Sequence, residues 1–255
     1  VHAMRMAGEK AVGATAYVTL EPCSHYGRTP PCAEGLIKAK VARVVCAMVD
    51  PNPKVAGRGI QMLRDAGVEV QIGLLERDAL ALNPGFIKYM RKGMPFVQLK
   101  MAASLDGQSA LSNGQSQWIT SPAARQDVQR YRAMSGGILS TSKTVIDDNA
   151  SLNVRWDDLP TSVQAQYLRE ELRQPVRVIL DRQNHLTDAL KLFHTDGERV
   201  IVSPDGDCIP LLDGADQIDL STTLKRISDE HHINHLWVEA GATLASAMIK
   251  ANLVD

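Results

Sequence analysis

The sequence is poor in cysteine and aromatic residues and has no long apolar run. Its four cysteines among 255 residues are too few for a disulfide-dense scaffold, so we expect a reducing, cytoplasmic compartment. The most apolar windows, such as residues 41–49, are far shorter than the roughly 20 residues that a membrane-spanning helix needs, and the opening residues do not resemble a secretory leader. We therefore expect no membrane partner, and with 4% aromatics we expect an aliphatic core.

Neither sign of charge dominates the chain. It has 28 Lys and Arg against 29 Asp and Glu, a formal net charge of −1 at pH 7. A broad cationic surface of the kind that drives non-specific nucleic-acid binding is therefore absent from the composition. We expect no nucleic-acid partner and favour a small substrate that is recognised locally.

Strand-like and helix-like segments alternate in the first part of the chain. A β-rich run at residues 14–22 and apolar strands at 42–50 and 68–73 are separated by helical patterns at 32–40 and 57–67. This alternation indicates an α/β fold with a mostly parallel sheet. Ligands of such sheets gather at the carboxyl ends of the strands.

A charged helical pattern at residues 75–93 precedes a second strand-rich section, so we place domains at 1–93 and 94–255. The second section again mixes both types of element, which predicts another α/β domain. Its strands are expected near 95–104, 136–140, 174–181, 198–203 and 235–240, and its helices near 121–134, 222–231 and 242–253.

The segment "EPCSHYGRTPPC" at residues 21–32 follows the first strand and contains two cysteines. Zinc prefers thiolate and imidazole ligands, and Cys23 at a strand end and Cys32 at a helix start could supply two thiolates. Spacing alone leaves open that both are buried cysteines flanking an unusual turn. Cys46, inside an apolar run, is expected in the core, and Cys208 is expected to be structural.

Zinc nucleobase deaminases combine a P-C…C segment with an upstream H-x-E motif, in which the Glu moves protons. The segment "TLEPCSHYGRTPPC" resembles the long-spaced form found in the bifunctional riboflavin-biosynthesis deaminase/reductase family, with the eight residues "SHYGRTPP" between Cys23 and Cys32. The resemblance implies that these two cysteines are zinc ligands. It also implies that the first domain is a cytidine-deaminase-like three-layer domain.

In that family an H-A-E triplet immediately precedes a segment like the "VHA" that opens this chain. The resemblance therefore implies that the zinc-binding His and the general acid/base Glu lie just before Val1, and that His2 matches a histidine that is not a ligand. We expect the C-terminal strands of the second domain to lie outside these residues as well. If these 255 residues were the whole protein, we would expect no deamination and weak zinc binding.

Each of the other polar residues singled out in the first half could have a functional or a structural role. His25 and Arg28 could reach the substrate ring or phosphate, or they could stabilise the loop. Asp50 and Asn52 in "DPNP" could bind the sugar, although Asp-Pro-Asn-Pro is also ordinary turn chemistry.

The second half lacks the G-x-G-x-x-G fingerprint of dinucleotide-binding folds. It has instead "WVEAGATLASAMI" at residues 237–249, where a strand ending at Glu239 is followed by a Gly and small residues that open a helix. Small residues allow a ligand to approach the backbone, and free amides at a helix start favour a phosphate. Such a pattern is also common helix packing.

Three more segments, "LKMAASLDG" (99–107), "SQWITS" (116–121) and "TVIDDNASLNVR" (144–155), resemble the reductase half of the same family, whose fold is like dihydrofolate reductase. Asn149 and Ser151 depart from the family, which usually has Asp and Pro there. The resemblance implies an NADPH site formed by Ala102, Trp118, Thr144, Asp148, Gly241, Ala242, Thr243, Leu244, Ala245, Ser246 and Ala247. It implies a substrate site formed by Ser116, Arg132, Leu152, Arg155 and Glu239.

The chemistry of these side chains is compatible with that assignment. A phosphorylated ribose needs cations, and Arg132 and Arg155 are candidates, although either could be a solvated charge. Lys100 near the end of an apolar strand is expected to be paired or functional, because a buried ammonium without compensation is costly. Asp106 and Glu239 could hydrogen bond the sugar.

We therefore predict an enzyme of riboflavin biosynthesis with zinc and NADPH as cofactors. It would deaminate a diaminopyrimidinone ribosylamino 5′-phosphate, then reduce the ribosyl group to ribityl by hydride transfer, and we expect a homo-oligomer. One alternative is a nucleic-acid or nucleoside deaminase. Another is a structural zinc module attached to a nucleotide-binding regulatory domain.

Overall fold

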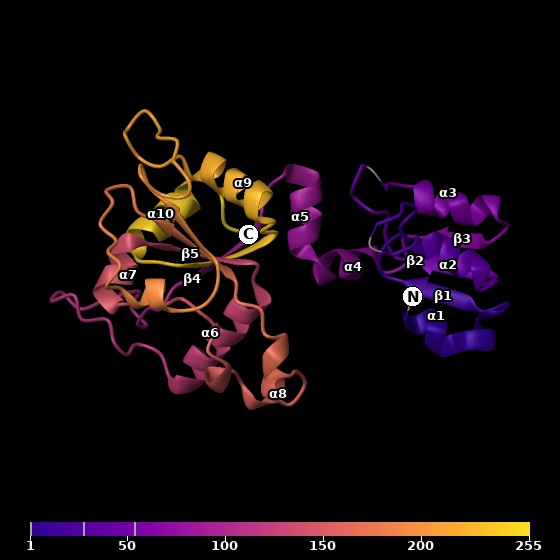
Figure 1. Cartoon of the computed structure of the whole chain (residues 1–255), viewed down its shortest axis with the longest axis horizontal. Helices are drawn as coiled ribbons and strands as arrows, with labels where there is room; N and C mark the ends of the chain where they lie inside the picture. The colour runs from indigo at the N-terminus through magenta and orange to yellow at the C-terminus, as the bar shows by residue number, and fades with distance from the viewer. Residues whose placement is uncertain (1, 28, 54) are drawn as a thin grey trace. The chain divides into compact units, whose positions relative to one another are not determined.

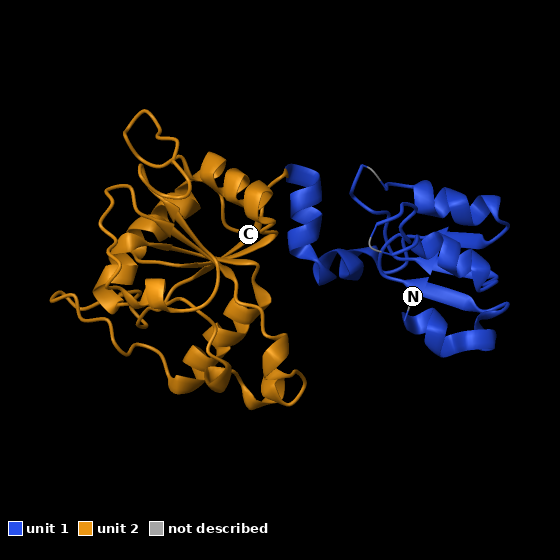
Figure 2. Ribbon diagram, viewed as in Figure 1, with its two compact units in different colours: residues 1–92 blue, residues 93–255 orange. Residues whose placement is uncertain are grey.

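The computed structural model describes residues 2–27, 29–53 and 55–255. The chain divides into two compact units, Val1–Lys92 and Gly93–Asp255, which are coloured separately in Figure 2. Each unit contains one parallel sheet and its own helices, labelled in Figure 1.

The first unit contains a three-stranded parallel sheet with the order β1-β2-β3. The strands are β1 (Thr15–Val18), β2 (Arg43–Cys46) and β3 (Glu69–Ile72). The helices are α1 (His2–Ala7), η1 (Gly8–Ala11), α2 (Cys32–Lys38), α3 (Arg58–Asp65), α4 (Glu76–Leu82) and α5 (Pro84–Lys92).

The core of this unit forms between the central strand β2 and the helices α2 and α3. Val44 of β2, Leu36 of α2 and Leu63 of α3 belong to one buried aliphatic cluster. Cys46 is fully buried, as predicted, and burial raises the pKa of its thiol to about 11. The single helix predicted over 75–93 is wrong: α4 ends at Leu82 and α5 begins at Pro84, because proline lacks the amide that would continue a helix.

The second unit contains a five-stranded parallel sheet with the order β4-β8-β5-β6-β7. The strands are β4 (Phe96–Lys100), β5 (Gly137–Thr141), β6 (Val176–Leu180), β7 (Arg199–Val202) and β8 (His235–Glu239). The helices are α6 (Pro122–Met134), α7 (Ser142–Asp148), η2 (Trp156–Asp158), α8 (Thr161–Gln164), η3 (Arg169–Glu171), η4 (Lys191–His194), α9 (Leu220–His231) and α10 (Ala242–Lys250).

Both faces of the second sheet are buried. Leu139 of β5 packs in a cluster that includes Leu224 of α9 and Met248 of α10. Its neighbour Ile138 packs in a separate cluster with Val145 of α7. Because successive strand residues point to opposite faces, the two clusters lie on the two sides of the sheet, which explains the near-continuous apolar strands.

The strand predicted over 95–104 is shorter than expected, because β4 ends at Lys100. Residues 101–120 leave the sheet and contain neither helix nor strand. In the register of β4 and β8, Lys100 lies opposite Glu239. The carboxyl ends of β4, β8 and β5 therefore meet at one edge of the sheet, where a ligand is expected.

Candidate functional site

Cys23 and Cys32 lie beside each other. Cys23 follows the end of β1, and α2 begins at Cys32, whose amide donates a hydrogen bond to Cys23 Sγ at 3.2 Å. Burial raises the pKa of the Cys32 thiol, and its hydrogen bond to the Cys23 thiol acts in the same direction. Both thiols are partly exposed and free, so two soft donors are available side by side.

This donor pair fits part of a tetrahedral zinc site, which accepts thiolates at adjacent corners. Within the described residues no group of three or more His, Cys, Asp and Glu side chains could hold a metal ion. The described residues thus supply two of the ligands that zinc requires.

Sequence reasoning missed Glu21, which is buried two residues before Cys23. Its Oε2 accepts hydrogen bonds from the amides of Asp50 (3.1 Å) and Gly57 (2.9 Å), and its Oε1 accepts hydrogen bonds from those of Gly59 (2.9 Å) and Ile60 (3.3 Å). This carboxylate therefore fixes the loop before α3 against the cysteine segment. A glutamate at the end of a predicted strand was the available signal, but its partners are distant in sequence.

Gly59 allows α3 to approach the cysteine segment closely. A Cβ atom at this position would lie 1.8 Å from the carbonyl oxygen of Pro22, closer than any side chain tolerates. Since that carbonyl is backbone, any larger residue at Gly59 would displace the segment that leads into Cys23.

The other polar residues proposed in this unit differ in their exposure. His25 is exposed, and Arg28 lies outside the described residues. Asp50 is buried and its Oδ1 accepts a hydrogen bond from the Asn52 amide at 2.8 Å. This contact is the turn chemistry that was one of the two readings of "DPNP".

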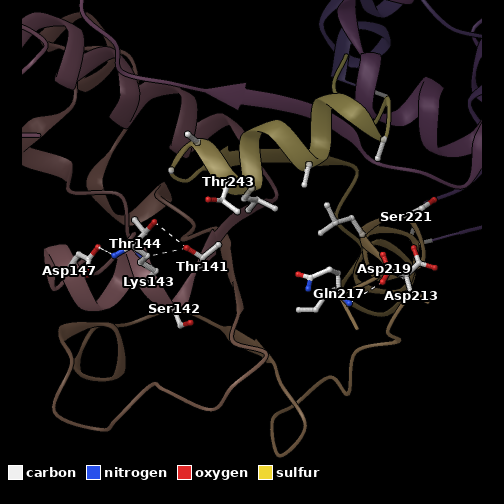
Figure 3. A pocket seen from close by; sticks show the side chains of 17 residues that line it. Thr141, Ser142, Lys143, Thr144, Asp147, Asp213, Gln217, Asp219, Ser221 and Thr243 are labelled. Carbon is white, nitrogen blue, oxygen red and sulfur yellow. Dashed lines mark hydrogen bonds and ion pairs between the residues drawn. The ribbon is translucent and has the colours of Figure 1, made fainter. Parts of the chain in front are cut away.

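A cavity of about 730 Å³ opens in the second unit beside the end of β5 and the start of α10 (Figure 3). Its size lies within the range of about 300–1,000 Å³ that ligand pockets commonly have. From the predicted cofactor set, the cavity wall includes Thr144, Gly241, Ala242, Thr243, Leu244 and Ala247. The remaining members, Ala102, Trp118, Asp148, Ala245 and Ser246, do not line it in the described structure.

Helix α10 starts at this cavity. Its N-cap residue, Gly241, makes no side-chain capping hydrogen bond, so the first amides of this nine-residue helix are left for another acceptor. Thr144 lies across the cavity, and its amide is capped by Thr141 Oγ1 at 3.3 Å. The wall also includes polar side chains that sequence reasoning did not assign: Thr141, Ser142, Lys143, Asp147, Asp213, Gln217, Asp219 and Ser221 (Figure 3).

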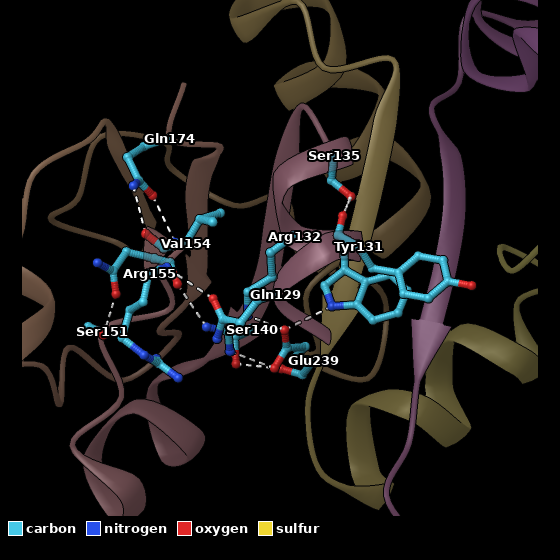
Figure 4. Close-up of polar contacts among 12 residues, drawn as sticks. Gln129, Tyr131, Arg132, Ser135, Ser140, Ser151, Val154, Arg155, Gln174 and Glu239 are labelled. Atoms are coloured by element: carbon cyan, nitrogen blue, oxygen red, sulfur yellow. Dashed lines mark hydrogen bonds and ion pairs between the residues drawn. The ribbon is translucent and has the colours of Figure 1, made fainter. Parts of the chain in front are cut away.

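Glu239 at the end of β8 and Arg132 of α6 form a two-pronged ion pair (Figure 4). Arg132 Nε donates to Glu239 Oε1 at 2.6 Å, and Nη2 donates to Oε2 at 2.8 Å. Trp237 Nε1 also donates to Oε1 at 2.8 Å. Burial would raise the pKa of Glu239, but the hydrogen bond and charge of Arg132, with Trp237 and Lys100, bring that pKa below its ordinary value.

The predicted substrate residues thus differ in their surroundings. Arg132 is buried, and its Nη1 donates to the Asn153 carbonyl at 3.0 Å, so it is not a solvated charge. Arg155 is half-exposed and pairs with Asp158. Ser116 is exposed in the 101–120 segment.

Trp118 lies in the same segment and is largely exposed, so it is not part of the core. The Arg125 guanidinium carbon lies 4.4 Å from its ring centroid. Asp148 accepts a hydrogen bond from Gln117 Nε2 at 3.4 Å. The segment that carries Trp118 therefore contacts the end of α7, where Asp148 lies.

Two parallel α/β units, one with paired thiols at a strand end and one with a cavity at the carboxyl ends of its strands, make up the described structure. This is the arrangement expected of an enzyme that combines a zinc deaminase unit with a nucleotide-dependent reductase unit.

Comparisons with known proteins agree with this class. Residues 95–255 match the RibD C-terminal domain family, and residues 1–48 match the cytidine and deoxycytidylate deaminase zinc-binding region. The riboflavin biosynthesis protein RibD of Haemophilus influenzae is 54% identical over 259 residues, covering 99% of this chain and 70% of that protein. The Escherichia coli protein of the same name is 50% identical over 266 residues, covering 100% and 72%.

Solved structures show the same relationship. Acinetobacter baumannii RibD superposes with a TM-score of 0.88 at 48% identity, covering 99% of this chain and 70% of that one. A diaminohydroxyphosphoribosylaminopyrimidine deaminase/5-amino-6-(5-phosphoribosylamino)uracil reductase from Thermotoga maritima superposes with a TM-score of 0.80 at 33% identity, covering 98% and 68%. The chain belongs to the RibD family.

Membership confirms the predicted family, the fold class, the bifunctional deaminase and reductase activity in riboflavin biosynthesis, and zinc and NADPH as cofactors. It argues against both alternatives, the nucleic-acid or nucleoside deaminase and the non-catalytic zinc module. No helix in the described ranges is long and apolar enough to cross a membrane.

Proposed function

We propose that this chain acts on a pyrimidine that carries a ribosylamino 5′-phosphate, replaces a ring amino group by oxygen, and then reduces the ribosyl group to ribityl with NADPH. The deaminase and 5-amino-6-(5-phosphoribosylamino)uracil reductase activities named for the Thermotoga maritima relative support this substrate class. We also propose functional domains at residues 1–93 and 94–255, the limits expected from the sequence.

In the deaminase domain, Cys23 and Cys32 would hold zinc as thiolates. When bound, zinc lowers the pKa of a water molecule so that it can attack the amino-bearing ring carbon. Glu21 and Gly59 keep the cysteine segment and the start of α3 in contact, which fixes the position of Cys23.

In the reductase domain, the cavity beside α10 would hold the dinucleotide, with the free amides of the helix start facing a phosphate. The proposed cofactor residues are Ala102, Trp118, Thr144, Asp148, Gly241, Ala242, Thr243, Leu244, Ala245, Ser246 and Ala247. Because nicotinamide supplies the hydride, these residues contribute position and polarity.

One observation carries the substrate assignment: Glu239 ends β8 with its carboxylate paired to the guanidinium of Arg132. Its own carbonyl accepts a hydrogen bond from Ser140 Oγ at 2.6 Å, and Gly241, two residues later, lines the cavity. Its carboxylate can accept a hydrogen bond from a sugar hydroxyl while Arg132 neutralises its charge. The proposed substrate residues are Ser116, Arg132, Leu152, Arg155 and Glu239.

Arg155 is the residue best placed to bind the phosphate, because its guanidinium is half-exposed and, in the described part of the chain, pairs with the half-exposed Asp158. We expect Arg155→Ala to raise the KM for the deaminated pyrimidine phosphate about tenfold or more, since a charge-assisted contact is lost. Loss of NADPH absorbance measures this turnover. Arg169→Ala, an exposed arginine paired with Asp157, is the matched control and should leave the KM unchanged.

The absence of NADPH oxidation with this substrate in the parent protein would contradict the proposed function. An equal rise in KM in the Arg155→Ala and Arg169→Ala variants would contradict the role of Arg155.

A homo-oligomer and a cytoplasmic location also remain proposals. The free cysteines of the described chain and the balanced charge support a reducing compartment and a small-molecule partner. Light scattering of the purified chain would measure the oligomeric state.

A further inference from the structure

The loop of residues 149–155, which follows α7, has an unusual backbone that its surroundings must hold. Asn149 has φ of +45° and Leu152 has φ of +53°, both in the left-handed region that disfavours non-glycine residues. The loop contains neither helix nor strand, so it has no ladder of its own to fix this shape. Side chains from other elements supply the missing contacts.

Gln174, just before β6, hydrogen bonds the loop backbone through its side-chain amide, much as a neighbouring strand would through its backbone (Figure 4). Its Oε1 accepts a hydrogen bond from the Val154 amide at 2.8 Å, and its Nε2 donates to the Val154 carbonyl at 2.9 Å. Gln129 of α6 is buried, and its Oε1 accepts a hydrogen bond from the Arg155 amide at 3.0 Å. Two amide side chains thus satisfy three consecutive polar groups of the loop backbone.

Arg177 of β6 holds the loop from inside the unit. Its side chain is fully buried, and its Nη1 donates to the Ser151 carbonyl at 3.0 Å and to Thr195 Oγ1 at 2.6 Å. Its Nη2 donates to three further carbonyls. Burial lowers the pKa of this guanidinium, and within the described chain its hydrogen-bond partners are carbonyls and a hydroxyl rather than a carboxylate.

Two side chains of the loop differ in burial. Leu152 is buried in the cluster formed with Ile138 and Trp237. Arg155, whose amide is fixed by Gln129, extends a half-exposed guanidinium. The hydrogen bonds therefore hold the loop backbone in place, while the guanidinium of Arg155, the group of the loop that could bind a phosphate, stays accessible.

We propose that Gln129, Gln174 and Arg177 are positioning residues that hold the 149–155 loop so that Arg155 meets the substrate phosphate. The inference rests on the proposed function of this loop. A loop that is already ordered loses less freedom when the substrate binds, so its binding residues act at lower cost. None of the three needs to touch the substrate for this effect.

The test compares Gln174→Leu with Gln164→Leu. Gln164 is a matched control, because its Nε2 also donates to two backbone carbonyls, those of Trp156 and Leu159, each at 3.0 Å, just beyond the loop. We expect the KM for the deaminated pyrimidine phosphate to rise about tenfold in Gln174→Leu only, the scale of two lost hydrogen bonds. The KM for NADPH should stay within about twofold in both variants.

Two further variants test whether weaker contacts to the loop raise the KM for the sugar phosphate. Gln174→Glu keeps the acceptor for the Val154 amide but loses the donor, so its KM should lie between those of the parent and Gln174→Leu. Arg177→Lys should also raise the KM for the sugar phosphate, because a lysine cannot reach both Ser151 and the far carbonyls. If Arg177→Lys does not fold, the glutamine series decides alone.

Hydrogen exchange separates this inference from the proposed function. In Gln174→Leu the amides of Val154 and Arg155 should exchange faster than in the parent. If these amides exchange faster but the KM of Gln174→Leu for the deaminated pyrimidine phosphate is unchanged, the positioning role is overturned. An equal rise of this KM in Gln164→Leu also overturns it. So does a parallel rise in the KM of Gln174→Leu for NADPH. An unchanged KM in Arg155→Ala instead overturns the proposed role of the loop in substrate binding.

Discussion

Glu239 and Arg132, from β8 and α6, face each other with both carboxylate oxygens paired to the guanidinium at 2.6 and 2.8 Å. The two residues lie 107 positions apart in sequence. Both are largely buried, so neither charge can be solvated if the other is removed.

Glu239→Gln should therefore destabilise the protein strongly. The substitution keeps the shape of the side chain but leaves the buried guanidinium of Arg132 without a counter-charge, and we expect a loss of about 3 kcal/mol in the free energy of unfolding. Urea unfolding followed by circular dichroism measures it. Glu198→Gln, which breaks the exposed pair with His231, is the control and should cost less than about 1 kcal/mol; equal losses would contradict the prediction.

The Glu239–Arg132 pair should make the free energy of unfolding depend on pH. The pKa of Glu239 is lower in the folded protein than its ordinary value, which is about 4.3 for an unfolded chain. Its contribution to stability is therefore fully present above that value and is lost as the pH falls through the folded pKa. Urea midpoints measured from neutral to acidic pH should fall more steeply for the parent than for Glu239→Gln; parallel curves would contradict this.

Glu21→Ala should loosen the start of α3. The substitution leaves four backbone amides without the acceptor that they share, including those of Gly59 and Ile60. We expect these two amides to exchange at least about tenfold faster. Glu34→Ala removes a carboxylate whose hydrogen-bond partners among the described residues, Tyr26 and Lys38, are exposed, and it should not change these exchange rates.

Zinc binding should depend on the paired cysteines and not on the buried one of the second unit. Cys23→Ala and Cys32→Ala each remove a thiolate donor, so we expect zinc affinity to fall at least about tenfold, as measured by competition with a chromophoric chelator. Cys208→Ala should leave the affinity unchanged, because Cys208 lies in the apolar core of the other unit. Equal affinity in the parent and Cys23→Ala would contradict the proposed zinc site.

Local patterns predicted much of the fold. The strand at 235–240 and the helix at 222–231 correspond to β8 and α9, because alternation of apolar residues and helix-favouring periodicity act over a few residues. Two predicted elements have wrong bounds. The single helix predicted over 75–93 is divided into two helices, because Pro84 cannot continue a helix. The strand predicted over 95–104 ends early because the chain after Lys100 finds no sheet partner.

Two parallel α/β units, the cysteine segment and the small residues that open α10 were determined by the sequence itself, since each depends on short spacings and on residue type. The tertiary structure alone decided which polar groups meet. Glu21 reaches amides 29 to 39 positions away, and Arg177 reaches a loop 26 positions away. Such contacts depend on which strands become neighbours in the sheet, and no local pattern of the sequence encodes that order.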